Sequence, residues 1–288
     1  MTELLLHKTA RQALDNFIAK PSHAVLLIAP SGSGKGAVAK LLAGQLLQLP
    51  EQKLISSPHF KHLVPNSNKG IAVDDIREVI HFTTLRSTAQ TSINRVIIIE
   101  DSQQMTAQAQ NALLKTLEEP PAGTIIILTA PSELSLLPTI RSRLQLLTLP
   151  LIDNLAIVNY FKSQGYQSAV IERALLMSGG LLGLMHALLE EDNDHPLVKA
   201  TKIAHDLLEQ TTFDRLAGID NLAKDRQLCS DVLFILAQMA SIALGHDQKN
   251  VKVLQKWQRI LTASHTASGQ LLANAQTKLV LLNFMLSL

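Results

Sequence analysis

The sequence has little cysteine, few aromatic side chains and almost no net charge. Cys229 is the one cysteine among 288 residues, so the chain can form neither an internal disulfide nor a cysteine-based metal cluster. Aromatic residues make up 3% and charged residues 17%, and the formal net charge is +2. Proteins that hold DNA alone by charge are usually strongly basic. The composition argues against that class, and it leaves open a protein that meets DNA as one member of a complex.

Long apolar runs are also scarce. The longest that stand out, 124–130 and 279–288, are too short to cross a bilayer. Residues 1–12 lack the apolar centre of a signal peptide. Together with the single cysteine, these features predict a cytoplasmic protein with no membrane partner. Hydrophobic residues still reach 47%, which either fills a helical core or leaves apolar surface for partner proteins.

Short apolar runs alternate with helical patterns in the first half of the chain. The expected strands are Ala24–Ala29, His59–Val64, Val96–Ile99, Ile125–Leu128 and Leu144–Leu149. The expected helices are His7–Ile18, Ala37–Leu47, Val73–Phe82 and Ala107–Leu117. Continuous apolar strands between helices predict a parallel sheet that is covered on both faces.

Pro150 marks a change of pattern. After it only helical patterns follow, with interruptions at Gly179–Gly183 and Asp192–Pro196. A chain of 288 residues is long enough for two domains or three small ones. We therefore expect an α/β domain over residues 1–150, a small helical domain over 151–192 and a second helical domain over 196–288.

The segment between the first expected strand and the next helix has the pattern of a phosphate-binding loop. It reads Ala29-Pro-Ser-Gly-Ser-Gly-Lys35-Gly36. Gly32 and Gly34 allow backbone N–H groups to turn toward a phosphate, and the following helix adds positive potential at its N-terminus. Lys35 would reach the β- and γ-phosphates of a nucleotide. The alternative is an ordinary strand–turn–helix with a lysine on the surface.

Two positions depart from the P-loop pattern G-x-x-x-x-G-K-[ST]. Ala29 stands in place of the first glycine, and Gly36 stands in place of the serine or threonine that ligates Mg²⁺. Glycine has no side-chain oxygen, so the metal loses a ligand. Because hydrolysis depends on metal positioning, the sequence predicts a loop that binds phosphate without efficient turnover.

A second motif, an acidic strand, also predicts inefficient hydrolysis. The run Arg95-Val-Ile-Ile-Ile-Glu100-Asp101 resembles a Walker B strand, but the usual order is aspartate followed by glutamate. Each carboxylate is then displaced by about one methylene, and a misplacement of about 1 Å can reduce a rate about 100-fold. The alternative is that Glu100 and Asp101 cap the segment that follows.

The run from Asn111 to Pro121, Asn-Ala-Leu-Leu-Lys-Thr-Leu-Glu-Glu-Pro-Pro, is more particular than a generic helix. It resembles the clamp-loader signature of bacterial DNA polymerase III. Ser57–Phe60, Asp74–Arg77 and Leu137–Arg143 lie around it in the order found in that family. The resemblance covers residues 1–185. It implies an AAA+ domain at 1–150, a helical lid at 151–192 and a helical collar at 196–288 that assembles subunits into a ring.

The resemblance also implies roles for individual residues. The family's Ser-Arg-Cys motif, whose arginine projects into the ATP site of the adjacent subunit, corresponds to Ser142-Arg143-Leu144, with the cysteine replaced. Arg143 is therefore the expected arginine finger, with Arg141 as the alternative. Thr129 matches the polar position called sensor 1, or it is a plain threonine at a strand end.

Other family features are missing. Leucines occupy the region Gly179–Gly183, where a sensor 2 arginine is expected, and residues 48–58 replace the four-cysteine zinc module of gamma/tau subunits. His59 and His62 are too few to bind zinc, so we expect both to be exposed to solvent. Together with the altered P-loop and the reversed acids, these losses favour a resemblance to delta prime subunits over gamma/tau subunits.

A delta prime resemblance implies a largely non-catalytic subunit of the clamp loader, which loads the sliding clamp onto primed DNA. The implied partners are gamma/tau and delta subunits, the sliding clamp and, through the complex, primer–template DNA. No cofactor is required, and ATP or ADP would bind weakly without hydrolysis. Two alternatives stay open at this point. One is an active AAA+ ATPase resembling gamma/tau, and the other is a nucleotide sensor without clamp-loader partners.

Overall fold

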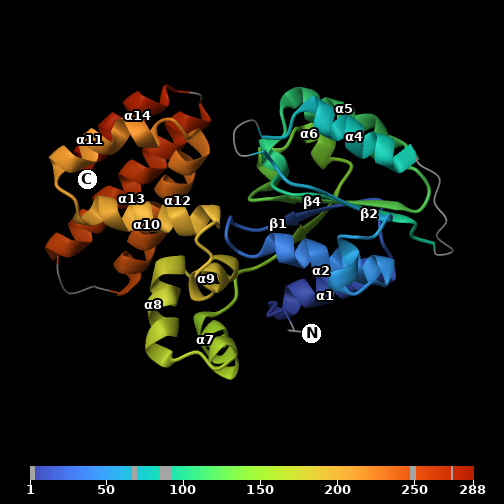
Figure 1. Ribbon diagram of the computed structural model, residues 1–288, viewed down its shortest axis with the longest axis horizontal. Coiled ribbons are helices and arrows are strands. Elements are labelled where there is room, and N and C mark those ends of the chain that lie inside the picture. Colours follow the sequence, from blue (N-terminus) through green and yellow to red (C-terminus); the bar gives the residue numbers. More distant parts are fainter. Residues whose placement is uncertain (1–3, 67–69, 85–91, 247–250, 274) are drawn as a thin grey trace. The chain divides into compact units, whose positions relative to one another are not determined.

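The computed structural model describes residues 4–66, 70–84, 92–246, 251–273 and 275–288 (Figure 1). The chain forms two compact units, Met1–Ile152 and Asp153–Leu288. The division falls close to Pro150, where the sequence changes from an alternating to a purely helical pattern.

The first unit is built on a five-stranded parallel sheet in the order β2-β3-β4-β1-β5. Each predicted apolar run forms one of its strands, which are β1 (Ala24–Ile28), β2 (Phe60–Leu63), β3 (Arg95–Ile99), β4 (Thr124–Ala130) and β5 (Gln145–Thr148). The register places Leu26 beside Leu128 and Ile97 beside Ile126. Because the strands are parallel, the segments that follow β1, β3 and β4 meet at one edge of the sheet.

Helices cover both faces of this sheet, with α1 and α2 on one side and α4, α5 and α6 on the other (Figure 1). Their bounds are α1 (Lys8–Ala19), α2 (Lys35–Leu47), α3 (Glu51–Leu54), α4 (Val73–Thr84), α5 (Ala107–Glu118) and α6 (Pro138–Arg141). Alternate strand residues divide between two cores: Val96 and Ile98 pack with α1 and α2, whereas Ile97 and Ile99 pack with α4 and α5. The period-two alternation of a strand explains this division.

The helix ends follow local signals in the sequence. The Thr106 hydroxyl accepts a hydrogen bond from the Ala109 N–H and so caps the start of α5, and Pro120 follows its end. Pro138 occupies the first position of α6, where a missing N–H costs nothing. These signals end α5 at Glu118 and α6 at Arg141, two residues before Arg143.

The second unit is helical throughout its described residues. Its helices are α7 (Asn154–Ser163), α8 (Ser168–Ser178), α9 (Leu182–Leu189), α10 (Pro196–Glu209), α11 (Thr212–Leu222), α12 (Arg226–His246), α13 (Val251–Leu272) and α14 (Thr277–Ser287). The predicted breaks coincide with Gly179 and Gly180, both at positive φ, and with Pro196 at the start of α10. One hydrophobic core extends from Leu181 to Met285. The division of this unit into lid and collar stays a prediction.

Helix α12 was not among the apolar stretches that the sequence analysis singled out. By length and composition alone, residues Arg226–Gly245 could cross a membrane, a test that the core helix of a soluble protein also passes. Here Val232, Leu233 and Leu236 are buried in the core of the second unit. Cys229 lies in the same helix, and burial raises the pKa of its thiol to about 12.

We expect Ile98→Ala to lower the free energy of unfolding by about 2–5 kcal/mol, because it removes a fully buried side chain from the middle of β3. Ile55→Ala, at a side chain that is 77% exposed, is the matched control and should change it by less than about 0.5 kcal/mol. Urea unfolding followed by far-ultraviolet circular dichroism measures both. Equal losses in the two variants would contradict the placement of the core.

Candidate phosphate-binding site

The loop at residues 29–34 joins β1 to α2. Gly32 has φ 77° and Gly34 has φ 90°, a region that side chains other than glycine rarely adopt. The Ala29 N–H donates to the Ala130 carbonyl at 3.2 Å and so continues the pairing of β1 with β4. Ala29 does not have the positive φ that favours glycine, so the missing first glycine of the pattern has little local consequence.

Lys35 is the first residue of α2, and its side chain is buried rather than lying on the surface. It is 7% exposed, and its Nζ lies 2.9 Å from Asp101 Oδ1. Asp101 follows β3 and has φ 45°, in the left-handed region. The lysine that would reach a nucleotide phosphate is thus paired with a carboxylate of the same chain.

Glu100 is paired in a similar way, with a residue of the neighbouring strand. Its Oε2 lies 2.8 Å from Nε2 of His62, on β2. This hydrogen bond is the main reason that the pKa of Glu100 is held below its ordinary value, and the charges of His62, Lys40 and Lys35 act in the same direction against the effect of burial. Glu100 is therefore anionic at neutral pH.

The other carboxylate oxygen of Glu100 lies against the backbone of Gly36. A Cβ atom at position 36 would be only 1.9 Å from Glu100 Oε1 and 2.9 Å from its Cδ. Real Cβ atoms do not approach other atoms so closely. The carboxylate thus fills the space in which the side chain of a serine or threonine at this position would begin.

Thr129 fixes the turn that carries Asp101. It is fully buried near the end of β4, and its Oγ1 accepts a hydrogen bond from the Asp101 N–H at 3.0 Å. Its carbonyl accepts a hydrogen bond from the Ser102 hydroxyl at 2.8 Å. The hydroxyl predicted to sense a γ-phosphate is engaged with the backbone of its own chain.

These residues do not fit a nucleotide-bound magnesium ion. Gly36 offers no side-chain oxygen, and the carboxylates of Glu100 and Asp101 are bound to His62 and Lys35. The sheet does bring together the predicted residues of the loop, Glu100, Asp101 and Thr129. The side chains of Lys35, Glu100, Asp101 and Thr129 all have partners within the chain.

Arg143 is held at another place in the first unit. Its Nη2 donates to Glu118 Oε1 at 2.6 Å, and its Nη1 donates to the Thr139 carbonyl at 2.7 Å. Glu118 is the last residue of α5, within the signature segment, and the Arg143 side chain is 34% exposed. Leu144, at the position of the family's cysteine, is buried in the core. Arg141 makes no side-chain hydrogen bond or ion pair within the described part of the chain.

Two partners were missed from the sequence. We expected His59 and His62 to be exposed, and this was wrong: His59 is half-buried, and the side chain of His62 is 20% exposed and bound to Glu100. The register pairs Leu63 with Ile99, so the end of β2 lies beside the end of β3, and that adjacency could have predicted the contact. No comparable signal in the sequence predicted the ion pair of Glu118 with Arg143, because α5 and α6 are not linked by a strand register.

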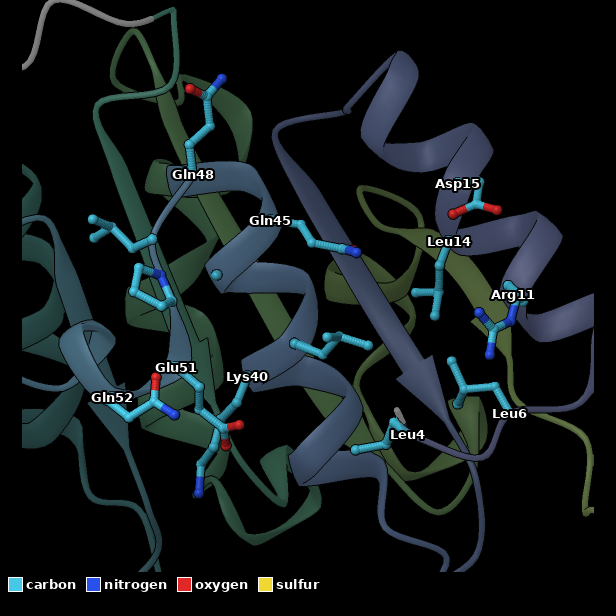
Figure 2. A pocket seen from close by; sticks show the side chains of 14 residues that line it. Leu4, Leu6, Arg11, Leu14, Asp15, Lys40, Gln45, Gln48, Glu51 and Gln52 are labelled. Carbon is cyan, nitrogen blue, oxygen red and sulfur yellow. The ribbon is translucent and has the colours of Figure 1, made fainter. Parts of the chain in front are cut away.

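A hollow of about 1,050 Å³ lies over α2, away from the loop (Figure 2). Leu4, Leu6 and Leu14 line one side of it, and Glu51 and Gln52 of α3 line the other. Its charged residues include both signs, so its lining selects no charge class of ligand. The residues that line it are Leu4, Leu6, Arg11, Leu14, Asp15, Lys40, Leu41, Gly44, Gln45, Gln48, Leu49, Pro50, Glu51 and Gln52.

Comparison with known proteins identifies the family. Residues 7–153 match the family described as DNA polymerase III, delta subunit. The chain belongs to this family. The DNA polymerase III subunit delta' of Pseudomonas aeruginosa is 34% identical over 179 residues, which cover 56% of this chain and 54% of that protein. The DNA polymerase III subunit delta' of Haemophilus influenzae is 32% identical over 172 residues, covering 55% and 52%.

The resemblance to delta prime subunits is thereby confirmed, and the chain spans about half the length of the curated relatives that it matches. A DNA polymerase III gamma subunit-related protein from Thermotoga maritima has a similar fold, with a TM-score of 0.55 at 20% identity over 96% of this chain and 97% of that one. The predicted fold class is confirmed: an α/β domain with a parallel sheet that resembles AAA+ P-loop folds, followed by a helical C-terminal portion.

We expect Glu100→Gln to weaken the loss of stability in acid. A carboxyl whose pKa is lowered by folding contributes stability that is complete above its unfolded pKa, here 4.5, and is lost as the pH falls through the folded value. The unmodified chain should therefore lose more stability than Glu100→Gln between about pH 5 and pH 3. The urea midpoint at each pH measures this, with the exposed Glu78→Gln as control. Parallel curves for the chain and Glu100→Gln would contradict the pairing.

Proposed function

We propose that this member of the DNA polymerase III delta subunit family is a largely non-catalytic, delta prime-like subunit of a cytoplasmic clamp loader. In this role it would help to load the sliding clamp onto primed DNA, and Arg143 would act at the ATP site of a neighbouring gamma/tau subunit. It would require no cofactor and no zinc. Any ATP or ADP would bind weakly and would not be hydrolysed.

The geometry of the phosphate loop supports the absence of turnover. Phosphoryl transfer relies on a metal ion that is positioned by a loop hydroxyl and an acidic strand. Gly36 supplies no hydroxyl, and both acids after β3 are bound to residues of the chain itself. A subunit with such a site would contribute to the complex through its surfaces rather than through its own chemistry.

The state of Arg143 is the observation that carries the proposal. Its guanidinium is held in one orientation by Glu118 and by the Thr139 carbonyl, while a third of the side chain is exposed. A planar donor that is oriented in advance loses less entropy when it binds a phosphate bidentately. In trans, such a group neutralises charge that develops on a γ-phosphate.

The last helix offers a surface for assembly with other subunits. Leu279, Leu282 and Leu286 are exposed and lie at helical spacing along α14, while Phe284 and Met285 are buried on its other face. Exposed apolar stripes of this kind usually mark contacts with partner proteins. We assign this stripe to contacts with gamma/tau or delta subunits within the predicted collar.

We expect Arg143→Ala to reduce DNA-stimulated ATP turnover in a complex reconstituted with gamma/tau and delta subunits. An arginine supplied in trans contributes about 10³-fold or more in rate to the site that receives it. Total turnover of the complex should therefore fall by the fraction that this site contributes. Arg141→Ala, tested in parallel, decides between the two arginines. Arg77→Ala, at an exposed arginine paired with Asp74, is the control for loss of surface charge.

Turnover that is unchanged in both Arg143→Ala and Arg141→Ala, in complexes that assemble normally, would refute the role in trans. Loss in Arg141→Ala alone would move the role to Arg141. Complex formation is measured separately by size-exclusion chromatography, so that a failure to assemble is not mistaken for a loss of catalysis.

A further inference from the structure

Carboxylates of the chain lie at both cationic features of the phosphate loop. Glu100 lies beside Gly36 in the first turn of α2, where backbone N–H groups favour an anion. Lys35 faces Asp101 at 2.9 Å. In a nucleotide-binding loop these two features would meet phosphate oxygens instead.

We propose that Glu100 closes this loop to polyphosphate and that His62 is the positioning residue that holds Glu100 in place. The inference deepens the proposed function, on which it rests, because it names the residues that weaken nucleotide binding by the loop of this subunit. It concerns the isolated chain and is independent of Arg143.

The position of Glu100 gives the physical reason. One of its carboxylate oxygens is fixed by His62 Nε2 at 2.8 Å, and the other lies directly against Gly36. Lys35 and Lys40 act on the charge of the same carboxylate. A polyphosphate that enters the loop would place its own negative charge beside an anion that is held in position, and such like-charge contacts oppose binding.

The same contact links two departures from the P-loop pattern. A side chain at position 36 would collide with Glu100, since its Cβ would lie 1.9 Å from Oε1. A side chain at position 36 and the present position of the Glu100 carboxylate therefore exclude each other. A shorter acid at position 100 would withdraw from Gly36 by about one methylene, a displacement of about 1 Å.

Glu100→Ala should open the loop. Titration calorimetry with inorganic pyrophosphate, on the full chain, should show binding roughly tenfold or more tighter than in the unmodified chain, because the opposing charge is removed. Glu78→Ala is the matched control, because it removes the same charge from an exposed glutamate. Adding Lys35→Ala to Glu100→Ala should abolish the gain and so place the ligand in the loop. His62→Ala should give a smaller gain in affinity, because Glu100 keeps its charge and loses only its fixed position.

Affinity in Glu100→Ala no greater than in the unmodified chain would overturn the proposal. A gain that survives the addition of Lys35→Ala, or an equal gain in Glu78→Ala, would overturn it as well. None of these results would change the outcome of the Arg143→Ala assay, so the failure of this inference and the failure of the proposed function are distinguishable.

A thermodynamic cycle tests the coupling without any ligand. Gly36→Ser should lower the urea midpoint in the unmodified chain, because the serine side chain displaces Glu100 from His62. In the Glu100→Ala background the same change should have a clearly smaller effect. Equal shifts in both backgrounds would contradict the coupling of the two positions. The cycle remains informative even if Glu100→Ala alone lowers stability, because only the difference between the two shifts is used.

Discussion

The contact between the Glu100 carboxylate and Gly36 sets the character of this phosphate loop. Its anion is provided by the chain, and His62 fixes that anion from a neighbouring strand. Lys35 is neutralised separately by Asp101. These ion pairs leave none of the three charges uncompensated when no nucleotide is present. The departures from the P-loop pattern therefore describe one consistent structure rather than a series of unrelated losses.

The parallel sheet makes this arrangement possible. The ends of β1, β2, β3 and β4 meet at one edge of the sheet. Lys35, Glu100 and Asp101 follow β1 and β3, and they meet His62 and Thr129, which stand near the ends of β2 and β4. The same unit holds Arg143 against the end of α5 through Glu118, where a third of its side chain remains exposed. In the account proposed for this family member, one domain thus combines an inward site that does no chemistry with an arginine offered to a neighbour.

Much of this could be predicted from the sequence, and the rest depended on contacts between distant segments. The strands were predictable because their apolar runs are continuous, and the loop because glycines and Lys35 follow the first of them. The sequence identified the two carboxylates but not their partners, because a partner such as His62 lies 38 positions from Glu100 in the sequence. The left-handed backbone of Asp101 depends on a hydrogen bond to Thr129, which no local pattern records. The apolar character of helix α12 was not recognised from the sequence, because polar residues interrupt its apolar run.

The central claim is that this chain does not turn over ATP by itself. Steady-state phosphate release from the purified chain, with Mg²⁺ and ATP, tests it most directly, and Lys35→Ala provides the reference for a loop that cannot function. The account predicts release indistinguishable from buffer, with no difference between the chain and Lys35→Ala. Sustained release that disappears in Lys35→Ala would contradict it and would support an active ATPase.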